Sequence, residues 1–334
     1  MKIKAYIKPA ADKDIQFGEV EAFPKDTEIV IKTTHVGLAR GDVFIMENAW
    51  KETVYPAIGT AENIGIIEEV GDKTIGFKVG DRVGTGYITS SCMTCTYCKA
   101  GLYQYCEKQI NTGSGGWGGF AEKIVIDYRL AVKIPDVLDS AIATPLMCYG
   151  VTAYSAIMKA KLQLNSKVGI IGLGGLGHIL LKILAAMGYD ITVFSHSLDK
   201  QIVANEFGAK TFILSTKPDW SKKYIKHFDL IINTSHQELQ LSDYIVLLKP
   251  DGKFCYIGLP FNAQSFQATD LADYGSRCIY GSYVGSTSEL TNLLDIAAKK
   301  GIRPEILTYP VSEYSKAIQE VKSGIPYKRV VLYW

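Results

Sequence analysis

The sequence predicts an α/β protein in which a mainly antiparallel β domain precedes a parallel-sheet domain. Residues 1–135 contain short alternating or apolar runs separated by glycine-containing turns, a pattern typical of antiparallel strands. After about residue 140, apolar strands alternate with helix-length segments, which indicates βαβ units around a parallel sheet. The 334 residues are enough for two domains of about 100–200 residues each.

Six runs define the predicted β domain, which has the size of a small barrel. Each combines β-branched or apolar residues with a turn at its end. In chain order they are IKAYI (3–7), EIVIKTTHVGL (28–38), NIGIIEEVG (63–71), DRVGTGYI (81–88), FAEKIVID (120–127) and AVKIP (131–135).

Six further runs define the strands of the predicted parallel sheet. They are VGIIG (168–172), DITVF (190–194), KTFIL (210–214), FDLIINT (228–234), GKFCYIGL (252–259) and CIYGSYV (278–284). Two helical patterns follow, ELTNLLDIAAKKG (289–301) and SEYSKAIQEVKSG (312–324). We expect the last strand, RVVLYW (329–334), to pack back on the β domain.

Composition and charge exclude several classes of partner. The net charge is +2 and the pI is about 8.0, so nothing in the charge favours nucleic acid. The most apolar segment (168–188) contains His178, Lys182 and many glycines, so we do not expect it to span a membrane. The N-terminal residues lack the apolar core of an export signal, which predicts a cytoplasmic protein in which disulfides are disfavoured.

The sequence GLGGLG at 172–177 directly follows the predicted strand VGIIG. It places glycines at the three positions of a G-x-G-x-x-G motif, namely Gly172, Gly174 and Gly177. These allow a tight turn, a close approach of a pyrophosphate, and close packing of helix against strand. The motif therefore predicts a dinucleotide site in a Rossmann domain.

The tip of the next strand indicates which dinucleotide binds. An NAD site has an acidic side chain there, whereas this chain continues from DITVF into Ser195-His196-Ser197 and then Lys200. Hydroxyls and an ammonium group suit a 2′-phosphate, so we predict NADP(H). A purely structural interpretation is compatible with this, in which Ser197 caps the next helix and Asp199 lies in its first turn.

The stretch CMTCTYCKAGLYQYC (92–106) carries four cysteines with the spacing C-x2-C-x2-C-x7-C. Four thiolates in one short loop can close a tetrahedral shell around Zn²⁺ and leave no position for substrate. We therefore predict one structural zinc ion, with an iron–sulfur cluster or a redox switch as alternatives. The predicted ligands are Cys92, Cys95, Cys98 and Cys106.

A β domain with this cysteine loop, followed by GLGGLG, resembles the zinc-type medium-chain alcohol dehydrogenases over essentially the whole chain. The segments PLMCYGVTAYS (145–155), FSHSLDK (194–200) and GSYVGS (281–286) are most similar to the cinnamyl-alcohol-dehydrogenase-like branch. The resemblance implies a GroES-like catalytic domain over 1–146 and 288–334, with 92–106 as its structural-zinc loop. It also implies a Rossmann NADP-binding domain over 147–287 and a homodimer.

The resemblance also exposes a loss. Members of this family normally hold a catalytic zinc through a Cys, a His and a second Cys. This chain has Ala39 and Ala61 at the first two ligand positions and keeps only Cys148 at the third. Glu62 and Cys148 form a two-ligand remnant, which would hold a metal weakly because a catalytic zinc normally needs three protein ligands.

The proton path of the family is altered as well. Gly41 replaces the threonine that relays the alcohol proton, and Phe44 stands where this branch often has a relay histidine. By the same resemblance Arg40 binds the cofactor pyrophosphate and Thr152 lies near the nicotinamide. The full set of predicted cofactor residues is Arg40, Thr152, Gly172, Gly174, Gly175, Leu176, Gly177, Ser195, His196, Ser197, Lys200, Thr234, Gly258, Ser282 and Tyr283.

These changes favour a particular reaction. Reducing an aldehyde creates an alkoxide-like oxygen that normally needs a Lewis acid, whereas reducing an enal, enone or quinone creates a delocalised enolate that hydrogen-bond donors can stabilise. We therefore predict an NADPH-dependent reductase of small activated alkenes or quinones that uses no catalytic zinc. A zinc-dependent alcohol dehydrogenase and a catalytically silent NADPH-binding sensor remain as alternatives.

Few substrate-binding residues can be predicted. Tyr149, next to the former ligand position, is the first candidate to donate a hydrogen bond or proton to the enolate, and solvent is the alternative. Trp50, Tyr87 and Trp117 fall in segments that line the substrate cleft of similar enzymes, although plain core packing explains each aromatic residue equally well.

Overall fold

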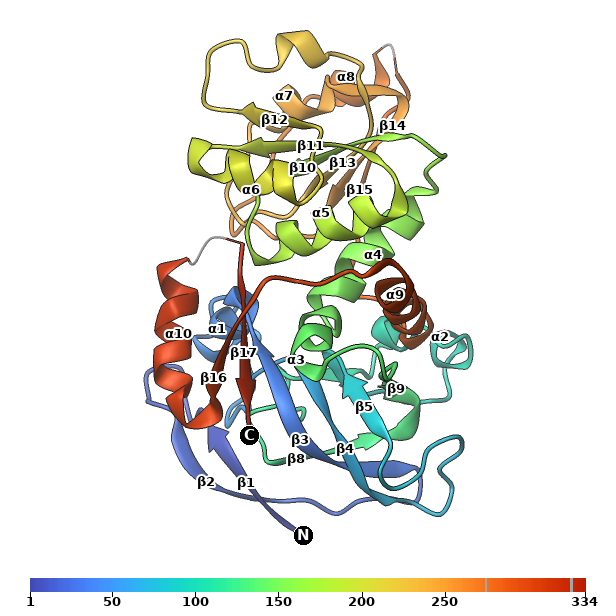
Figure 1. Cartoon of the computed structure of the whole chain (residues 1–334), viewed down its shortest axis with the longest axis vertical. Coiled ribbons are helices and arrows are strands. Elements are labelled where there is room, and N and C mark those ends of the chain that lie inside the picture. Colours follow the sequence, from blue (N-terminus) through green and yellow to red (C-terminus); the bar gives the residue numbers. More distant parts are fainter. Residues whose placement is uncertain (274, 325–326) are drawn as a thin grey trace. The chain divides into compact units, whose positions relative to one another are not determined.

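A computed structural model describes residues 1–273, 275–324 and 327–334 and divides them into two compact units (Figure 1). The first unit comprises Met1–Val151, Val284–Lys299 and Arg303–Trp334. The second comprises Thr152–Tyr283 and Lys300–Ile302. Residues 147–151, which the sequence analysis assigned to the cofactor domain, cluster with the first unit.

The first unit is built on a seven-stranded sheet with the order β16-β17-β3-β4-β5-β9, to which β8 adds by pairing with β3. All pairings are antiparallel except that of β16 with β17. The strands are β3 (Glu28–Leu38), β4 (Glu62–Val70), β5 (Arg82–Thr85), β8 (Lys123–Asp127), β9 (Ala131–Lys133), β16 (Ile306–Pro310) and β17 (Arg329–Tyr333). β17 pairs with β3, which confirms that the last strand packs on the β domain.

Two short ladders complete the β structure of this unit, and the sequence analysis did not predict one strand of either. They pair β1 (Lys2–Ile7) with β2 (Gln16–Glu21) and β6 (Ile88–Ser90) with β7 (Ile110–Asn111). β2 is largely exposed and β7 has two residues, so neither shows the apolar alternation that marks a half-buried strand.

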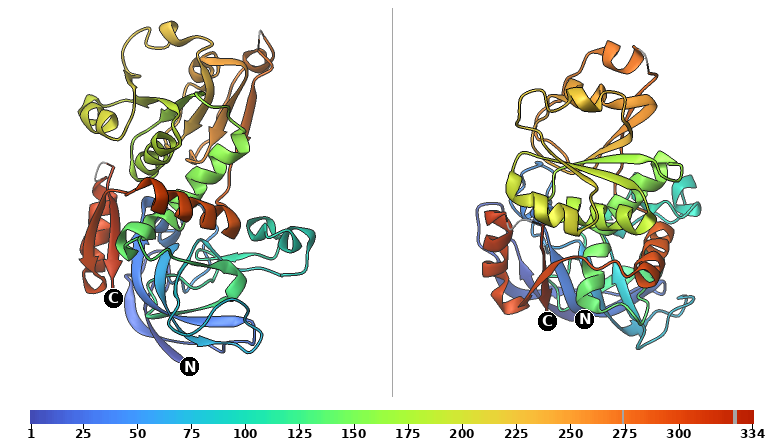
Figure 2. Two further views of the ribbon diagram at one scale, coloured as in Figure 1. Left: turned by 45° about the vertical axis from the view of Figure 1, so that its right-hand side comes forward. Right: turned by 45° about the horizontal axis from the view of Figure 1, so that its top comes forward.

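Short helices surround the sheets, and α10 lies beside the β16–β17 pair in both views of Figure 2. The helices of the first unit are α1 (Arg40–Met46), α2 (Thr96–Lys99), α3 (Ser140–Ala143), α9 (Thr287–Lys300) and α10 (Tyr314–Ser323), with α9 ending at the second unit. Its 3-10 turns are η1 (Tyr103–Tyr105), η2 (Tyr128–Leu130), η3 (Thr144–Leu146) and η6 (Val311–Glu313). α4 (Tyr149–Ala160) begins in the first unit and continues into the second.

The second unit is a six-stranded parallel sheet with the order β12-β11-β10-β13-β14-β15. Numbered along the chain this is 3-2-1-4-5-6, the strand order of the Rossmann fold. The strands are β10 (Lys167–Ile171), β11 (Asp190–Ser195), β12 (Thr211–Leu214), β13 (Phe228–Asn233), β14 (Leu248–Tyr256) and β15 (Cys278–Gly281). Its central strands are buried along almost their whole length, as expected of a parallel sheet covered by helices.

The helices of the second unit, besides most of α4, alternate with its strands. They are α5 (Gly175–Met187), α6 (Gln201–Glu206), α7 (Leu241–Ile245) and α8 (Ala268–Ala272), with 3-10 turns η4 (Leu198–Lys200) and η5 (Lys222–Tyr224). Among the described residues no single helix is long and apolar enough to cross a membrane, although the bent pair Ser140–Leu146 plus Tyr149–Ala160 passes on length and composition.

Candidate functional site

The four cysteines of the 92–106 loop converge on one point. Their sulfur atoms all lie within 4.8 Å of one another, and the Sγ atoms of Cys92 and Cys98 are 3.8 Å apart. All four are free thiols. Tetrahedral zinc with Zn–S bonds of about 2.3 Å needs S···S separations of about 3.8 Å, so the set fits the ion after only a small contraction.

Local hydrogen bonds prepare these sulfurs for a cation. The backbone N–H of Cys95 donates to Sγ of Cys92 at 3.3 Å, and that of Cys92 donates to Sγ of Cys106 at 3.4 Å. Bonds from Thr94 and from neighbouring amides lower the pKa of Cys92 to about 5, while burial raises the pKa of Cys98 to about 11. Donors that stabilise negative sulfur are what a thiolate metal site requires.

At the predicted position of the family's catalytic zinc, the backbone N–H groups of Ala39 and Ala61 donate hydrogen bonds to a neighbouring carboxylate. Ala39 and Ala61 are buried, and their N–H groups donate to the two carboxylate oxygens of Asp42 at 2.7 and 3.0 Å. Burial, followed by the nearby Glu62 carboxylate, raises the pKa of Asp42 to about 7. Asp42 thus fastens the end of β3 to the start of β4 through two main-chain bonds.

Glu62, which the sequence analysis considered as a remnant metal ligand, is an ion-pair partner in the structure. Its Oε2 accepts a 2.5 Å bond from Nη2 of Arg329, and its Oε1 accepts from the backbone N–H of Tyr149 at 3.0 Å. Glu62 and Arg329 are 1% and 3% exposed as side chains. A Cβ on Gly37 would lie 2.0 Å from Oε2, so only glycine leaves room for this carboxylate. A guanidinium group therefore neutralises Glu62, which leaves it poorly placed to bind a metal.

Tyr149 and Gly41 have complementary sizes. The N–H of Gly41 donates to the Tyr149 hydroxyl at 3.3 Å, and a Cβ built on Gly41 would lie 3.3 Å from that oxygen. The Arg329 guanidinium stacks 4.2 Å from the centre of the Tyr149 ring. Burial raises the pKa of Tyr149, so its hydroxyl remains protonated at neutral pH. A threonine at position 41 would crowd this hydroxyl.

Arg40, predicted to bind the pyrophosphate, contacts the last turn of α10. Its Nη2 donates to the carbonyl oxygen of Lys322 at 3.1 Å, and its guanidinium lies 6.0 Å from the ring of Phe44. Phe44 and Trp50 form an edge-to-face pair at 5.5 Å. Trp50 also borders Gly41, and its indole N–H is buried without a hydrogen-bond partner in the part of the chain that the structure describes.

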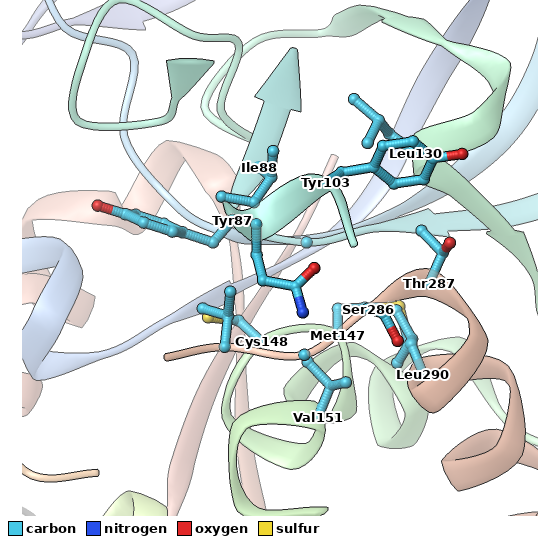
Figure 3. Close-up of a pocket in the computed structure, with 14 residues that line it drawn as sticks. Tyr87, Ile88, Tyr103, Leu130, Met147, Cys148, Val151, Ser286, Thr287 and Leu290 are labelled. Atoms are coloured by element: carbon cyan, nitrogen blue, oxygen red, sulfur yellow. The ribbon is translucent and has the colours of Figure 1, made fainter. Parts of the chain in front are cut away.

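One pocket of the first unit is lined in part by Cys148, which the sequence analysis placed at the third zinc-ligand position of the family (Figure 3). Of the three aromatic residues predicted for the substrate cleft, Tyr87 lines this pocket and Trp50 and Trp117 do not. Trp117 instead packs against the two β-sheet cores. The lining residues are Gly86, Tyr87, Ile88, Tyr103, Gln104, Leu130, Met147, Cys148, Val151, Val284, Gly285, Ser286, Thr287 and Leu290.

In the second unit the glycine motif has the geometry of a pyrophosphate cradle. Gly172 has φ +88°, and the Thr234 hydroxyl fixes this turn by donating to the carbonyl oxygens of Ile171 and Gly172 at 2.9 and 3.1 Å. A Cβ on Gly174 would meet nothing within 4 Å, whereas one on Gly177 would lie 2.2 Å from the Gly172 oxygen. The open backbone at the N-terminus of α5, which begins with Gly175 and Leu176, fits an anionic ligand.

At the tip of β11 the predicted phosphate ligands are partly engaged in their own turn. The buried Ser195 hydroxyl donates to the Ser197 carbonyl oxygen at 3.1 Å and accepts from the Ser197 N–H at 3.2 Å. Ser197 stands at the N-cap position of η4 and Asp199 lies in its first turn, as the structural interpretation predicts, but the Ser197 hydroxyl contacts the Asp199 carboxylate and makes no capping bond. His196 is exposed and Lys200 half-buried, so both remain accessible to a ligand.

The other predicted cofactor residues of the second unit lie just after strands, except Thr152, which lies on a helix. A Cβ on Gly258 would lie 2.3 Å from the Thr234 carbonyl carbon, so close backbone packing requires glycine there. The Ser282 hydroxyl accepts from Nζ of Lys159 at 3.0 Å, and Tyr283 is partly exposed. Thr152 lies on α4, where that helix enters this unit.

Sequence reasoning missed three functional candidates. Asp42 was missed because its partners are the backbone amides of Ala39 and Ala61, which a side-chain pattern does not show. Arg329 was missed because Glu62 lies 267 positions away, although a charged residue at the start of the apolar run RVVLYW was a signal for a buried ion pair. Gln104 lies between the third and fourth cysteines, in a segment that the sequence analysis had assigned entirely to metal binding.

Comparison with known proteins identifies the family. The family model "Alcohol dehydrogenase GroES-like domain" matches residues 25–136, and the model "Zinc-binding dehydrogenase" matches residues 175–299. An NADP-dependent alcohol dehydrogenase C from Mycobacterium bovis is 35% identical over 317 residues, covering 92% of this chain and 91% of that protein. A probable cinnamyl alcohol dehydrogenase from Oryza sativa subsp. japonica is 31% identical over 316 residues, covering 92% and 86%.

Solved structures agree with these relatives. A cinnamyl alcohol dehydrogenase from Sorghum bicolor matches with a TM-score of 0.93 and 28% identity, covering 100% of this chain and 98% of that one. The Helicobacter pylori enzyme, crystallised with NADP(H), matches with a TM-score of 0.91 and 29% identity over the same shares. The chain therefore belongs to the zinc-type medium-chain alcohol dehydrogenases and is an oxidoreductase of their cinnamyl-alcohol-dehydrogenase-like branch.

Proposed function

We propose that this oxidoreductase uses NADP(H) to reduce activated C=C bonds in small enals, enones or quinones, without a catalytic zinc. The observation that carries the proposal is the replacement of two family zinc ligands by Ala39 and Ala61, neither of which has a side chain able to bind metal. The pairing of Glu62 with Arg329 supports it, because the local carboxylate already has a cation. The cysteine loop would hold the one structural zinc ion.

The relatives and the second unit support NADP(H) as the cofactor. One relative is named an NADP-dependent alcohol dehydrogenase, and one structural neighbour was crystallised with NADP(H). The open backbone at Gly174 would receive the pyrophosphate, and His196 and Lys200 would approach the 2′-phosphate. When bound, NADPH supplies a hydride, and the protein contributes binding, orientation and control of the proton.

The negative charge that forms on the substrate oxygen distinguishes conjugate reduction from direct carbonyl reduction. Hydride addition to the β-carbon of an enal, enone or quinone leaves an enolate or phenolate whose negative charge is delocalised onto oxygen. A proton then completes the product. Direct reduction of an unconjugated aldehyde concentrates that charge on one oxygen, for which zinc would normally contribute several kcal/mol. Loss of the zinc ligands therefore costs carbonyl reduction more than conjugate reduction.

Tyr149 is the side chain that we propose as the donor to the substrate oxygen. Its hydroxyl accepts a bond from the Gly41 N–H, which leaves its own proton for donation to a second oxygen. Its raised pKa keeps that proton in place at neutral pH. The hydroxyl also lies against Gly41, the position of the family's relay threonine.

A substrate panel run beside metal quantification tests the proposal. With NADPH we expect turnover of enals, enones or quinones at least about 100-fold faster than of matched saturated aldehydes, and one zinc ion per chain. Two zinc ions per chain together with preferred aldehyde reduction would establish the zinc-dependent alternative. Tight NADPH binding without reduction of any compound would favour the silent sensor.

The Tyr149→Phe variant tests the donor. Removing one preorganised donor to a developing oxyanion typically lowers kcat about 100-fold or more, so we expect a loss of that size with KM little changed. The matched control is Tyr314→Phe, which removes a hydroxyl bonded to the Ile15 carbonyl oxygen in the same unit. An unchanged kcat in Tyr149→Phe would assign the proton to solvent.

The Ser195→Asp variant tests the cofactor preference. A carboxylate at the tip of β11 would repel a 2′-phosphate and bind a ribose 2′-hydroxyl, so we expect the ratio of kcat/KM for NADPH over NADH to fall at least about tenfold. An unchanged ratio would contradict a phosphate site at this tip. The homodimer and the cytoplasmic location stay predictions, which sedimentation and localisation of the tagged protein would check.

A further inference from the structure

Gln104 is a buried polar side chain whose amide oxygen has no hydrogen-bond partner among the described residues. It lies in η1, between the third and fourth cysteines of the loop, and is 2% exposed. Its Oε1 is buried and accepts no hydrogen bond from any residue that the structure describes. A buried acceptor without a donor is unfavourable for folding, so its retention calls for another explanation.

The side chain borders the pocket beside Cys148. Much of that lining is apolar, and Figure 3 shows Ile88, Leu130 and Leu290 around the same space. Another polar residue of the lining is already occupied, because the Ser286 hydroxyl is bonded to the Glu289 carboxylate at 3.0 Å. Gln104 therefore combines a place in the pocket lining with a buried amide oxygen that no described protein group satisfies.

The cysteine loop holds Gln104 in position. The backbone carbonyl oxygen of Gln104 accepts a bond from Nε2 of Gln109 at 3.2 Å, and the backbone N–H of Cys106 bonds to the Tyr103 carbonyl oxygen at 3.1 Å. The residue lies two positions before a predicted zinc ligand. These bonds fix the backbone around Gln104 within the same short loop as the cysteines.

We propose that Gln104 is a specificity-determining residue that accepts a hydrogen bond from a hydroxyl group of the substrate. The ligand class is a small molecule with an apolar body and a hydroxyl group away from its reactive carbon. This inference rests on the proposed function for the identity of the reactive group, but the recognition of the hydroxyl does not depend on turnover. A site built to bond a substrate hydroxyl discriminates strongly against the analogue that lacks it.

Paired ligands test the assignment. The reactive pairs are trans-2-hexenal and its derivatives hydroxylated at C4, C5 or C6, compared by kcat/KM with NADPH. The unreactive pair is 1-hexanol and 1,6-hexanediol, compared by Kd on the NADPH-bound protein. In the wild-type protein we expect at least one hydroxylated enal, and the diol, to be preferred about tenfold or more.

The Gln104→Leu variant should abolish this preference while leaving the kcat for trans-2-hexenal within about twofold. Its Tm and zinc content should not fall, because leucine has a similar volume and removes an unpaired polar atom. Thr112→Val is the matched control, since Thr112 is 1% exposed, its hydroxyl has no partner among the residues that the structure describes, and it does not line the pocket. It should keep the preference. Gln104→Met provides the same readout if leucine disturbs the loop.

Two outcomes would overturn the assignment. One is a wild-type protein that does not distinguish any hydroxylated ligand from its parent, and the other is a preference that survives in Gln104→Leu. Failure of the proposed function looks different. In that case no enal is reduced, yet the diol still binds more tightly than 1-hexanol and loses this advantage in the variant.

Discussion

The cysteine loop and the Ala39–Ala61 region are the two metal positions of one family architecture, and they have diverged completely. In the loop, four sulfurs within 4.8 Å of one another keep a geometry that suits zinc. In the Ala39–Ala61 region, two alanine amides bond to Asp42, and Arg329 neutralises Glu62. The four thiols of the loop suit a bound metal ion, whereas the carboxylate of the second region is already paired with the guanidinium group of Arg329.

The difference indicates which metal site this fold needs. The four thiols of this short loop converge on one point, where a bound ion would link them, so we expect the loss of zinc to disorder the loop. The Ala39–Ala61 region lies in a β-sheet core, where hydrogen bonds and an ion pair can replace the metal. If the reaction is the proposed conjugate reduction, it needs no Lewis acid, and the catalytic zinc ligands are dispensable.

The largest expected effect is that of Cys95→Ser. Losing one ligand should empty the zinc site, and since structural zinc contributes on the order of 10 kcal/mol in isolated peptides, we expect Tm to fall by more than about 10 °C. Metal analysis should show a fall from one zinc ion per chain to nearly none. The surviving folded fraction should still reduce trans-2-hexenal.

The control for this variant is Cys278→Ser, which alters an exposed cysteine outside the loop. It should change neither Tm nor zinc content. If the folded fraction of Cys95→Ser instead lost hydride transfer altogether, the division between a structural metal and a metal-free reaction would be wrong.

The next largest effect should come from Glu62→Gln. It leaves the Arg329 guanidinium buried without its counter-charge, which typically costs about 3–5 kcal/mol. Chemical denaturation of the first unit measures this cost. Glu68→Gln, on the same strand, breaks a 2.7 Å bridge to Lys123 nearer the surface and should cost less than about 1 kcal/mol. Equal costs would mean that the buried pair does not replace a metal energetically.

The smallest effect, taken per pH unit, is a pH dependence caused by Asp42. Its pKa is raised from 3.8 to about 7, so between these values the folded state binds more protons than the unfolded state. The free energy of unfolding should therefore decrease as pH rises from about 4 to 7, by at most about 1.4 kcal/mol per pH unit. Asp42→Asn should be less stable overall but lose this slope, as measured by denaturation at several pH values.

Asp81→Asn separates this effect from a general charge effect. Bonds from Lys133, which outweigh partial burial, lower the pKa of Asp81 to about 2, so its contribution is lost only as pH falls below about 4. The variant should keep the wild-type slope between pH 5 and 7. A slope that persists in Asp42→Asn would assign the proton uptake to another group.

The sequence predicted the features that are local along the chain and missed those that are not. The glycine turn and the cysteine loop each lie within fifteen residues, so spacing alone carries their geometry. The Glu62–Arg329 pair joins residues 267 positions apart, and the Gly41–Tyr149 bond spans 108. Such contacts depend on strand register, which no single segment encodes.

Gln104 and Trp50 show a second limit of reasoning from sequence. Gln104 lies in a segment already explained by metal binding, and only its burial and unsatisfied oxygen reveal it. The structure places Trp50 beside Gly41 and outside the pocket next to Cys148, which its segment did not reveal, and its role in a substrate cleft stays a prediction. Solvation and pocket membership are properties of the packed chain, and an amino-acid pattern does not contain them.

The pairing of β17 with β3 has a consequence for how this protein folds. Val330 lies opposite Leu38, so the central sheet of the first unit closes only when segments nearly 300 residues apart meet. The second unit is almost continuous along the chain and its strand contacts are far more local. Loop-closure entropy slows the first assembly more than the second. We therefore expect the Rossmann unit to fold early, and the Glu62–Arg329 pair to form among the last contacts.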